Sequence, residues 1–283
     1  MKEWEISDAV SELHRVKMMY GSSDAPFWFV GLEEANGDME DDPEGLIYGA
    51  LNMHLDYVRD GKRALRGQSC NVSACPDNCS YRNSDFLPCL YSDNKFDAKY
   101  QRTWGGYIKI LLTLLEGGFT RESVKLYQKF HLADIDNTPV AQQSALLELF
   151  PLHCKRQKKV WLYDKLSKVE GLQHLSTAEN YWSNVVDNEW DKLVNKIQQH
   201  SPSYVYLASQ NDFSSLLESV TRCDPRSIQW GDGKSTTSRF ATINNSTVFT
   251  GYHPAGGRGI TDHYWKNIGL TAALYRGQCS IAA

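Results

Sequence analysis

The stretch that decides the fold is FWFV, residues 27–30, followed directly by GLEEANG, residues 31–37. A short run of aromatic and β-branched residues is typical of a buried strand. The glycines and carboxylates after it predict a polar turn at the strand's end. Upstream, Ser7 can cap an amphipathic helix that stops near Gly21. The chain therefore begins as a helix followed by a buried strand.

Three further apolar runs repeat this pattern, at residues 145–150, 204–208 and 247–250. Segments with helical periodicity separate them. The expected helices cover residues 42–61, about 104–115, a segment from a Ser176–Glu179 capping box to about 199, and a final segment capped by Thr261. Short apolar strands that alternate with helices favour an α/β fold with a central, mainly parallel four-stranded sheet.

Composition limits the class of protein. The chain has 283 residues with a formal net charge of −4, and 41% of the residues are hydrophobic. No apolar run approaches the roughly 18 residues that a membrane span needs, and the N-terminal segment lacks a signal sequence. We expect one domain over residues 1–283, in a cytoplasmic, monomeric protein. Residues 62–100 lose periodicity and are expected to form an insertion within that domain.

Polar sequence follows three of the four expected strands. It comprises GLEEANG at 31–37, Glu148 with Pro151, and GYHPAGGRG at 251–259. Ligands of open α/β sheets bind beyond the carboxyl ends of the strands. These three segments are therefore the candidate site.

In this order, the three segments resemble short motifs of the uracil-DNA glycosylase superfamily. Gly31 with Glu33 resembles the motif that holds the hydrolytic water. ELFPL, residues 148–152, resembles the motif whose Asn reads the base edge, with Glu in place of Asn. His253-Pro254 resembles the last motif, whose loop enters the duplex. The resemblance implies a three-layer α/β/α sandwich and a glycosylase that acts on a base flipped out of duplex DNA.

The chemistry of N-glycosidic bond cleavage assigns a role to each catalytic candidate. Glu33 can orient or deprotonate the water, and its charge favours a cationic sugar in the transition state. Glu34 is the competing acid for this role. His253 can donate a hydrogen bond to O2 of the departing pyrimidine. No lysine occupies a motif position, so a monofunctional glycosylase is expected.

Base recognition is assigned to Glu148 and Phe150. A carboxylate repels O4 of uracil but accepts a hydrogen bond from the N4 amino group of cytosine. A buried, protonated Glu148 would also donate to N3. The alternative for Glu148 is a structural pair with a cation such as Lys155. Unmodified cytosine cannot be the target without destruction of the host genome, so a C5-modified cytosine is expected.

The leading target is glucosylated 5-hydroxymethylcytosine in phage DNA, because a bacterial defence branch of the superfamily removes that base. One alternative is a repair glycosylase for uracil or another damaged pyrimidine. A second is a non-catalytic module that binds modified DNA. A third is a metal-dependent nuclease that uses the acidic run Asp38, Glu40, Asp41 and Asp42.

Two segments are candidates for contact with DNA. Gly256 and Gly257 permit close approach of the backbone to a DNA phosphate. Arg258 can bind a phosphate or enter the DNA duplex. Lys155 and Arg156 belong to a basic run after the second motif. By contrast, residues 224–239, which include GDGKST, are expected to form a long loop.

Inside the insertion, a stretch of 20 residues contains four cysteines, Cys70, Cys75, Cys79 and Cys89. In a cytosolic protein such a group favours a metal centre over disulfides. The spacing does not decide between zinc and a 4Fe-4S cluster. Free cysteines in a surface loop remain the alternative.

Overall fold

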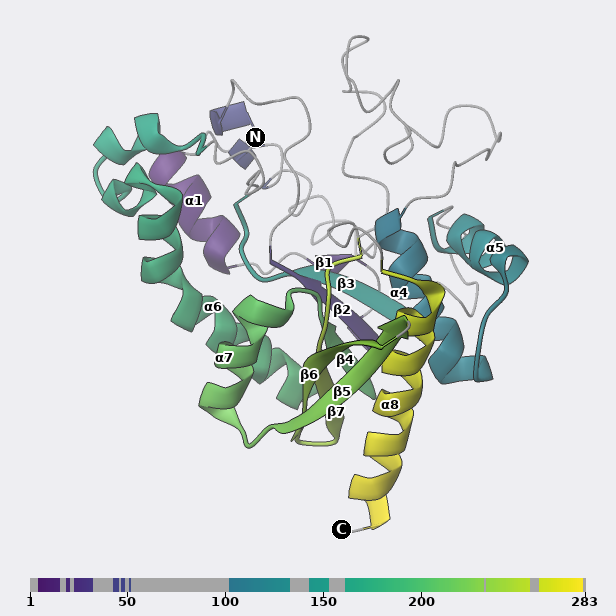
Figure 1. Ribbon diagram of the computed structural model, residues 1–283. Coiled ribbons are helices and arrows are strands. Elements are labelled where there is room, and N and C mark those ends of the chain that lie inside the picture. The colour runs from purple at the N-terminus through teal and green to yellow at the C-terminus, as the bar shows by residue number, and fades with distance from the viewer. Residues whose placement is uncertain are drawn as a thin grey trace.

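A seven-stranded mixed sheet forms the centre of the computed structural model (Figure 1). The strand order is β1-β3-β2-β4-β7-β6-β5. The structure describes residues 5–15, 19–20, 23–32, 43–45, 47–48, 51, 102–132, 143–152, 161–231, 233–254 and 260–281.

The middle of the sheet consists of four parallel strands. They are β2 (Phe27–Gly31), β3 (Ser144–Glu148), β4 (Tyr204–Leu207) and β7 (Ser246–Thr250). β2 pairs with β3 on one edge and with β4 on the other, and β4 pairs with β7. All four strands expected from the sequence therefore form, within a few residues of their predicted limits.

The sheet is wider than the four strands predicted. β1 (Met19–Tyr20) pairs antiparallel with β3 at one edge. At the other edge, β6 (Lys234–Ile243) pairs antiparallel with both β7 and β5 (Asp224–Gly231). Because β1 already occupies residues 19–20, the first helix cannot extend to Gly21 as expected. It is α1 (Ile6–Arg15).

Residues 224–239 form a β-hairpin, so the prediction of a long loop there is wrong. The side chains of β5 alternate between more exposed and more buried positions, with Ile228 fully buried. The turn contains Gly233, whose φ of 67° favours glycine. Within GDGKST, Gly231 ends β5, Gly233 lies in the turn, and residues 234–236 begin β6. Since Phe240 pairs with Phe249, residues 234–238 of β6 continue past the carboxyl end of β7.

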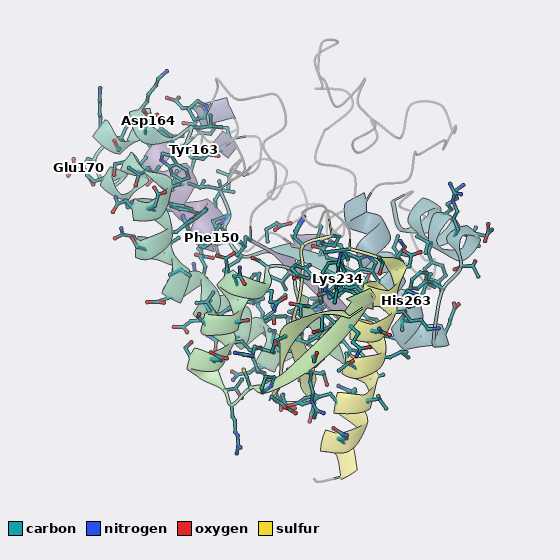
Figure 2. The ribbon with its side chains drawn as sticks, in the orientation of Figure 1. Phe150, Tyr163, Asp164, Glu170, Lys234 and His263 are labelled. Atoms are coloured by element: carbon teal, nitrogen blue, oxygen red, sulfur yellow. The ribbon has the colours of Figure 1, made fainter. Side chains whose placement is uncertain are left out.

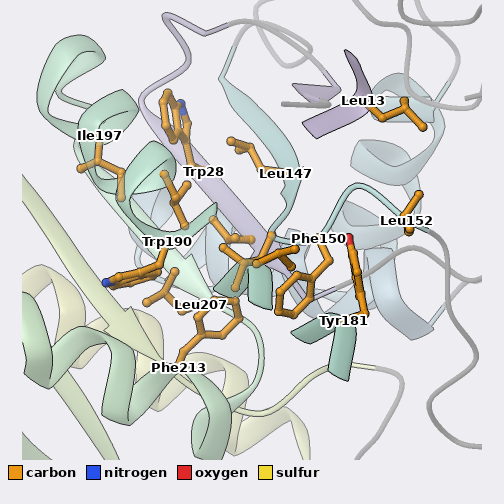
Figure 3. Packing of buried hydrophobic residues seen from close by; sticks show 14 of the residues in the cluster. Leu13, Trp28, Leu147, Phe150, Leu152, Tyr181, Trp190, Ile197, Leu207 and Phe213 are labelled. Atoms are coloured by element: carbon orange, nitrogen blue, oxygen red, sulfur yellow. The ribbon is translucent and has the colours of Figure 1, made fainter. Parts of the chain in front are cut away.

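Helices cover both faces of the sheet, which is compatible with a three-layer α/β/α arrangement (Figure 1). Trp28 and Val30 face α1, α6 (Ala178–His200) and α7 (Gln210–Val220), and Figure 3 shows part of this core. Phe27 and Phe29 face α4 (Arg102–Glu116) and α8 (Asp262–Ile281). The remaining elements are α5 (Arg121–Leu132), which packs on α4, and the short 3-10 helices η2 (Asp164–Lys168) and η3 (Gln173–Ser176).

The start of α6 differs from the predicted capping box. Thr177 is the N-cap residue, and its hydroxyl accepts a hydrogen bond from the backbone N–H of Asn180 at 3.0 Å. Ser176 instead ends η3, and its hydroxyl accepts from the side chain of Asn180. Among the residues described, no helix has the length and apolar character to cross a membrane.

A hydrogen-bonded cluster around one buried carboxylate joins α1 to α6. The carboxylate of Glu189 is only 1% exposed and lies 3.0 Å from Nδ1 of His14 and 2.7 Å from Nζ of Lys192. Nζ of Lys192 also donates to the carbonyl oxygen of His14 at 2.5 Å, near the end of α1. Glu189 is the buried charge of this cluster, and His14 and Lys192 compensate it.

We expect Glu189→Ala to lower the free energy of unfolding by about 1–3 kcal/mol, because it removes the buried acceptor shared by His14 and Lys192. Urea unfolding measures the change. Asp187→Ala removes an exposed acid from the same helix, so it should change stability by no more than about 0.5 kcal/mol. Equal effects of the two substitutions would contradict a structural role for the cluster.

Candidate functional site

The strand order predicts a crevice at the carboxyl edge of the sheet. β3 follows β2 in sequence and lies on one side of it, whereas β4 lies on the other side. Where the connections after two neighbouring parallel strands run in opposite directions, a crevice opens between the carboxyl ends of those strands. Open α/β sheets bind ligands in this crevice. The candidate site is therefore expected beyond the ends of β2 and β4.

Glu148, the last residue of β3, extends over the end of β2. It pairs in register with Gly31, and a Cβ atom on residue 31 would overlap its carboxylate. Only a residue without a side chain leaves this space. Backbone hydrogen bonds continue past both strands, from the N–H of Leu149 to the carbonyl of Gly31 and from Phe150 to Leu32. The carboxylate thus lies at the predicted crevice, on a backbone that pairing holds in place.

Tyr107 of α4 lies beside the Glu148 carboxylate. Its ring is buried and stacks on Phe29 with the centroids 4.6 Å apart. Burial raises the pKa of Tyr107 well above 10, and the nearby charge of Glu148 raises it further. The phenol is therefore neutral at physiological pH, with a proton available for hydrogen bonding.

The same turn of α4 also packs against the His253-Pro254 segment that follows β7. A Cβ atom on Gly106 would lie 2.6 Å from Cβ of Pro254, so the close approach requires glycine. Gly106 thus contacts the segment with the histidine, while its neighbour Tyr107 lies beside Glu148. One helix turn brings together two of the three predicted motifs.

A second link runs through Tyr206 of β4. Its ring centroid lies 6.1 Å from that of Tyr107, and its hydroxyl donates to the carbonyl oxygen of Tyr252 at 2.6 Å. Tyr252 immediately precedes His253. Buried aromatic contacts therefore connect Glu148, through Tyr107 and Tyr206, to the backbone that carries His253.

His253 is at the surface, yet surrounding protein still limits its hydration. This desolvation lowers the pKa of its imidazole below 6.5. The ring is consequently neutral at pH 7, with one N–H donor and one acceptor nitrogen. A neutral donor at this edge of the sheet suits stabilisation of an oxygen that gains negative charge.

Phe150 does not join this group. Its side chain is 5% exposed and belongs to the core on the opposite face of the sheet, where it stacks on Trp182 at 5.9 Å and contacts Tyr181. Figure 2 places Phe150 on the α6 side and His263, at the start of α8, on the other. Its assignment to base recognition is therefore not supported by its position.

Several predicted site residues lie outside the part of the chain that the structure describes. They are Glu33, Glu34, Lys155, Arg156, Gly256, Gly257, Arg258, Cys70, Cys75, Cys79 and Cys89. The acidic run at 38–42 also lies outside it. Within the described ranges, no group of three or more His, Cys, Asp or Glu side chains could hold a metal ion. The proposed four-cysteine centre therefore stays a prediction.

Sequence reasoning missed the tyrosines that organise the site. Tyr107 follows Gly105 and Gly106 at the start of an expected helix, and paired glycines there were a signal of close packing. Tyr206 gave no such signal, because an aromatic residue inside an apolar strand is ordinary core.

Comparison of the chain with models of known protein families and with curated proteins found no match.

Gly31→Ala should displace the Glu148 carboxylate, because the new methyl group overlaps it, whereas the fold should survive a shift at the end of a side chain. A crystal structure of the variant would show the displacement. Gly277→Ala in α8 is the matched control, since a Cβ there meets no atom within 4 Å. An unmoved Glu148 carboxylate in Gly31→Ala would contradict this description of the crevice.

The His253 imidazole should titrate with a midpoint below 6.5 in NMR, because partial burial disfavours its charged form. The resonance can be assigned by its loss in His253→Gln. A midpoint at or above 6.5 would mean that the ring is better hydrated than this geometry implies.

Proposed function

We propose that this protein is a monofunctional DNA glycosylase that hydrolyses the N-glycosidic bond of a C5-modified cytosine and leaves an abasic site. The leading substrate is glucosylated 5-hydroxymethylcytosine in phage DNA, and the corresponding biological role is defence against phage. One observation carries the proposal. The Glu148 carboxylate extends over Gly31 at the carboxyl edge, joined through Tyr107 to the segment that bears His253.

Hydrolysis of a nucleoside bond in DNA needs a flipped base, a positioned water and stabilisation of the departing base. In this proposal, His253 donates a hydrogen bond to O2 of the pyrimidine as negative charge develops there. Its lowered pKa favours the neutral imidazole, which can donate without delivering a full positive charge. Glu33, two residues after Gly31, is the proposed water-orienting acid.

Discrimination between bases is proposed to come from Glu148. A carboxylate accepts from the N4 amino group of cytosine, whereas it repels O4 of uracil. Tyr107 is a neutral donor next to that carboxylate, and a hydrogen bond from such a donor would hold the carboxylate in one orientation. Preference for a C5 substituent follows from the need to spare unmodified cytosine.

The test is base release from matched duplex oligonucleotides that contain uracil, cytosine, 5-hydroxymethylcytosine or its glucosylated form, with alkali to reveal abasic sites. We expect release only from modified cytosine. Glu33→Gln should abolish release, and Glu148→Gln should slow it by about tenfold to a hundredfold, the value of a hydrogen bond to a charged group. Glu170→Gln, at an exposed acid remote from the crevice, should retain full activity.

Release of uracil by the wild-type protein would keep the reaction class but contradict the role of Glu148. Tight binding of modified DNA without base release, unaffected by Glu33→Gln, would instead identify a recognition module. No release and no binding would remove the proposal altogether.

A further inference from the structure

Two buried tyrosine hydroxyls hold the backbone directly before His253. Tyr206, on β4, donates to the carbonyl oxygen of Tyr252 at 2.6 Å. The N–H of Tyr252 donates to the hydroxyl of Tyr264, in the first turn of α8, at 2.9 Å. The Tyr252 carbonyl belongs to the same peptide unit as the nitrogen of His253. One hydroxyl therefore holds the peptide that carries the histidine, and the other holds the peptide before it.

The backbone passes so close to these two hydroxyls that residue 251 has no room for a side chain. A Cβ atom on Gly251 would lie 2.5 Å from the hydroxyl oxygens of both Tyr206 and Tyr264. The N–H of Gly251 also donates to the carbonyl of Leu207 at 3.0 Å, which continues the pairing of β7 with β4. Residues 251 and 252 are consequently held by backbone and side-chain hydrogen bonds in succession.

Both tyrosines are rigidly placed. Tyr206 is 1% exposed and Tyr264 is fully buried. The Tyr206 ring packs on Phe249 at 5.3 Å, and the Tyr264 ring packs on Trp265 at 4.9 Å. Burial raises the pKa of Tyr206 well above 10 and that of Tyr264 to about 12. Both hydroxyls thus keep their protons over the pH range in which enzymes ordinarily work.

We propose that Tyr206 and Tyr264 are positioning residues for His253, which fix the imidazole relative to the crevice by holding the two peptide units before it. Neither hydroxyl needs to touch the substrate. A rigid second layer is what a catalytic donor requires, since small displacements of a reacting geometry are costly. The catalytic part of this inference rests on the proposed glycosylase function, whereas the positioning of His253 does not.

The test compares Tyr206→Phe and Tyr264→Phe with two matched controls. Tyr204→Phe removes a hydroxyl from the opposite end of β4, where the ring stacks on Phe27. Tyr275→Phe removes one from α8, more than two turns from Tyr264, where the ring packs on Phe240. All four variants keep the aromatic ring, and circular dichroism checks that each one folds.

In base-release assays, Tyr206→Phe and Tyr264→Phe should lower kcat by about tenfold to a hundredfold with little change in KM, the pattern of a misplaced catalytic group. The two controls should match wild type. In NMR spectra, the His253 ring resonances should move in both test variants and stay unchanged in the controls.

Wild-type kcat in both test variants, or a change in KM alone, would overturn the proposal. If the wild-type protein releases no base from any oligonucleotide, the glycosylase function fails, and the NMR spectra alone decide the positioning role. Unmoved His253 resonances would then overturn it, and resonances displaced only in Tyr206→Phe and Tyr264→Phe would support it.

Discussion

The hydrogen bonding of β2 on both of its edges is the constraint on which the rest of the structure depends. All five of its residues are buried, between β3 and β4 in the sheet and between two layers of helices. Phe29 supports the ring of Tyr107, and Gly31 leaves the space that the Glu148 carboxylate occupies. The Tyr107 ring and the Glu148 carboxylate therefore both rest on a strand that the protein encloses on its edges and faces.

Hydrophobic patterning predicted the four parallel strands because each one is apolar and enclosed by helices on both faces. The same reasoning missed the β5–β6 hairpin, because half of the residues in its two strands are Ser, Thr, Arg or Lys and few of their side chains are buried. It also misplaced the end of α1 and the cap of α6. Local preferences there are weaker than tertiary contacts and depend on neighbours that sequence alone does not place.

Glu148 and His253 could be selected from the sequence because polar residues directly after apolar strands lie at one edge of a parallel sheet. Tyr107 and Tyr206 could not, since one comes from a helix and the other from within a strand, and only packing brings them together. Phe150 is the reverse case, a residue selected from the sequence that packing separates from the group around Glu148. Adjacency to Glu148 in a motif suggested a shared role, but the chain turns beyond the strand and carries Phe150 into the other core.

The hairpin has a geometric consequence for access to the crevice. Residues 234–238 continue beyond the carboxyl end of β7, so the hairpin extends the sheet past this edge on the β7 side. Near the tip of the hairpin, Nζ of Lys234 lies 5.3 Å from the centroid of the Trp230 ring, and these two side chains add bulk there. A molecule that approached this edge from the β7 flank would therefore meet the hairpin before it reached the end of β7.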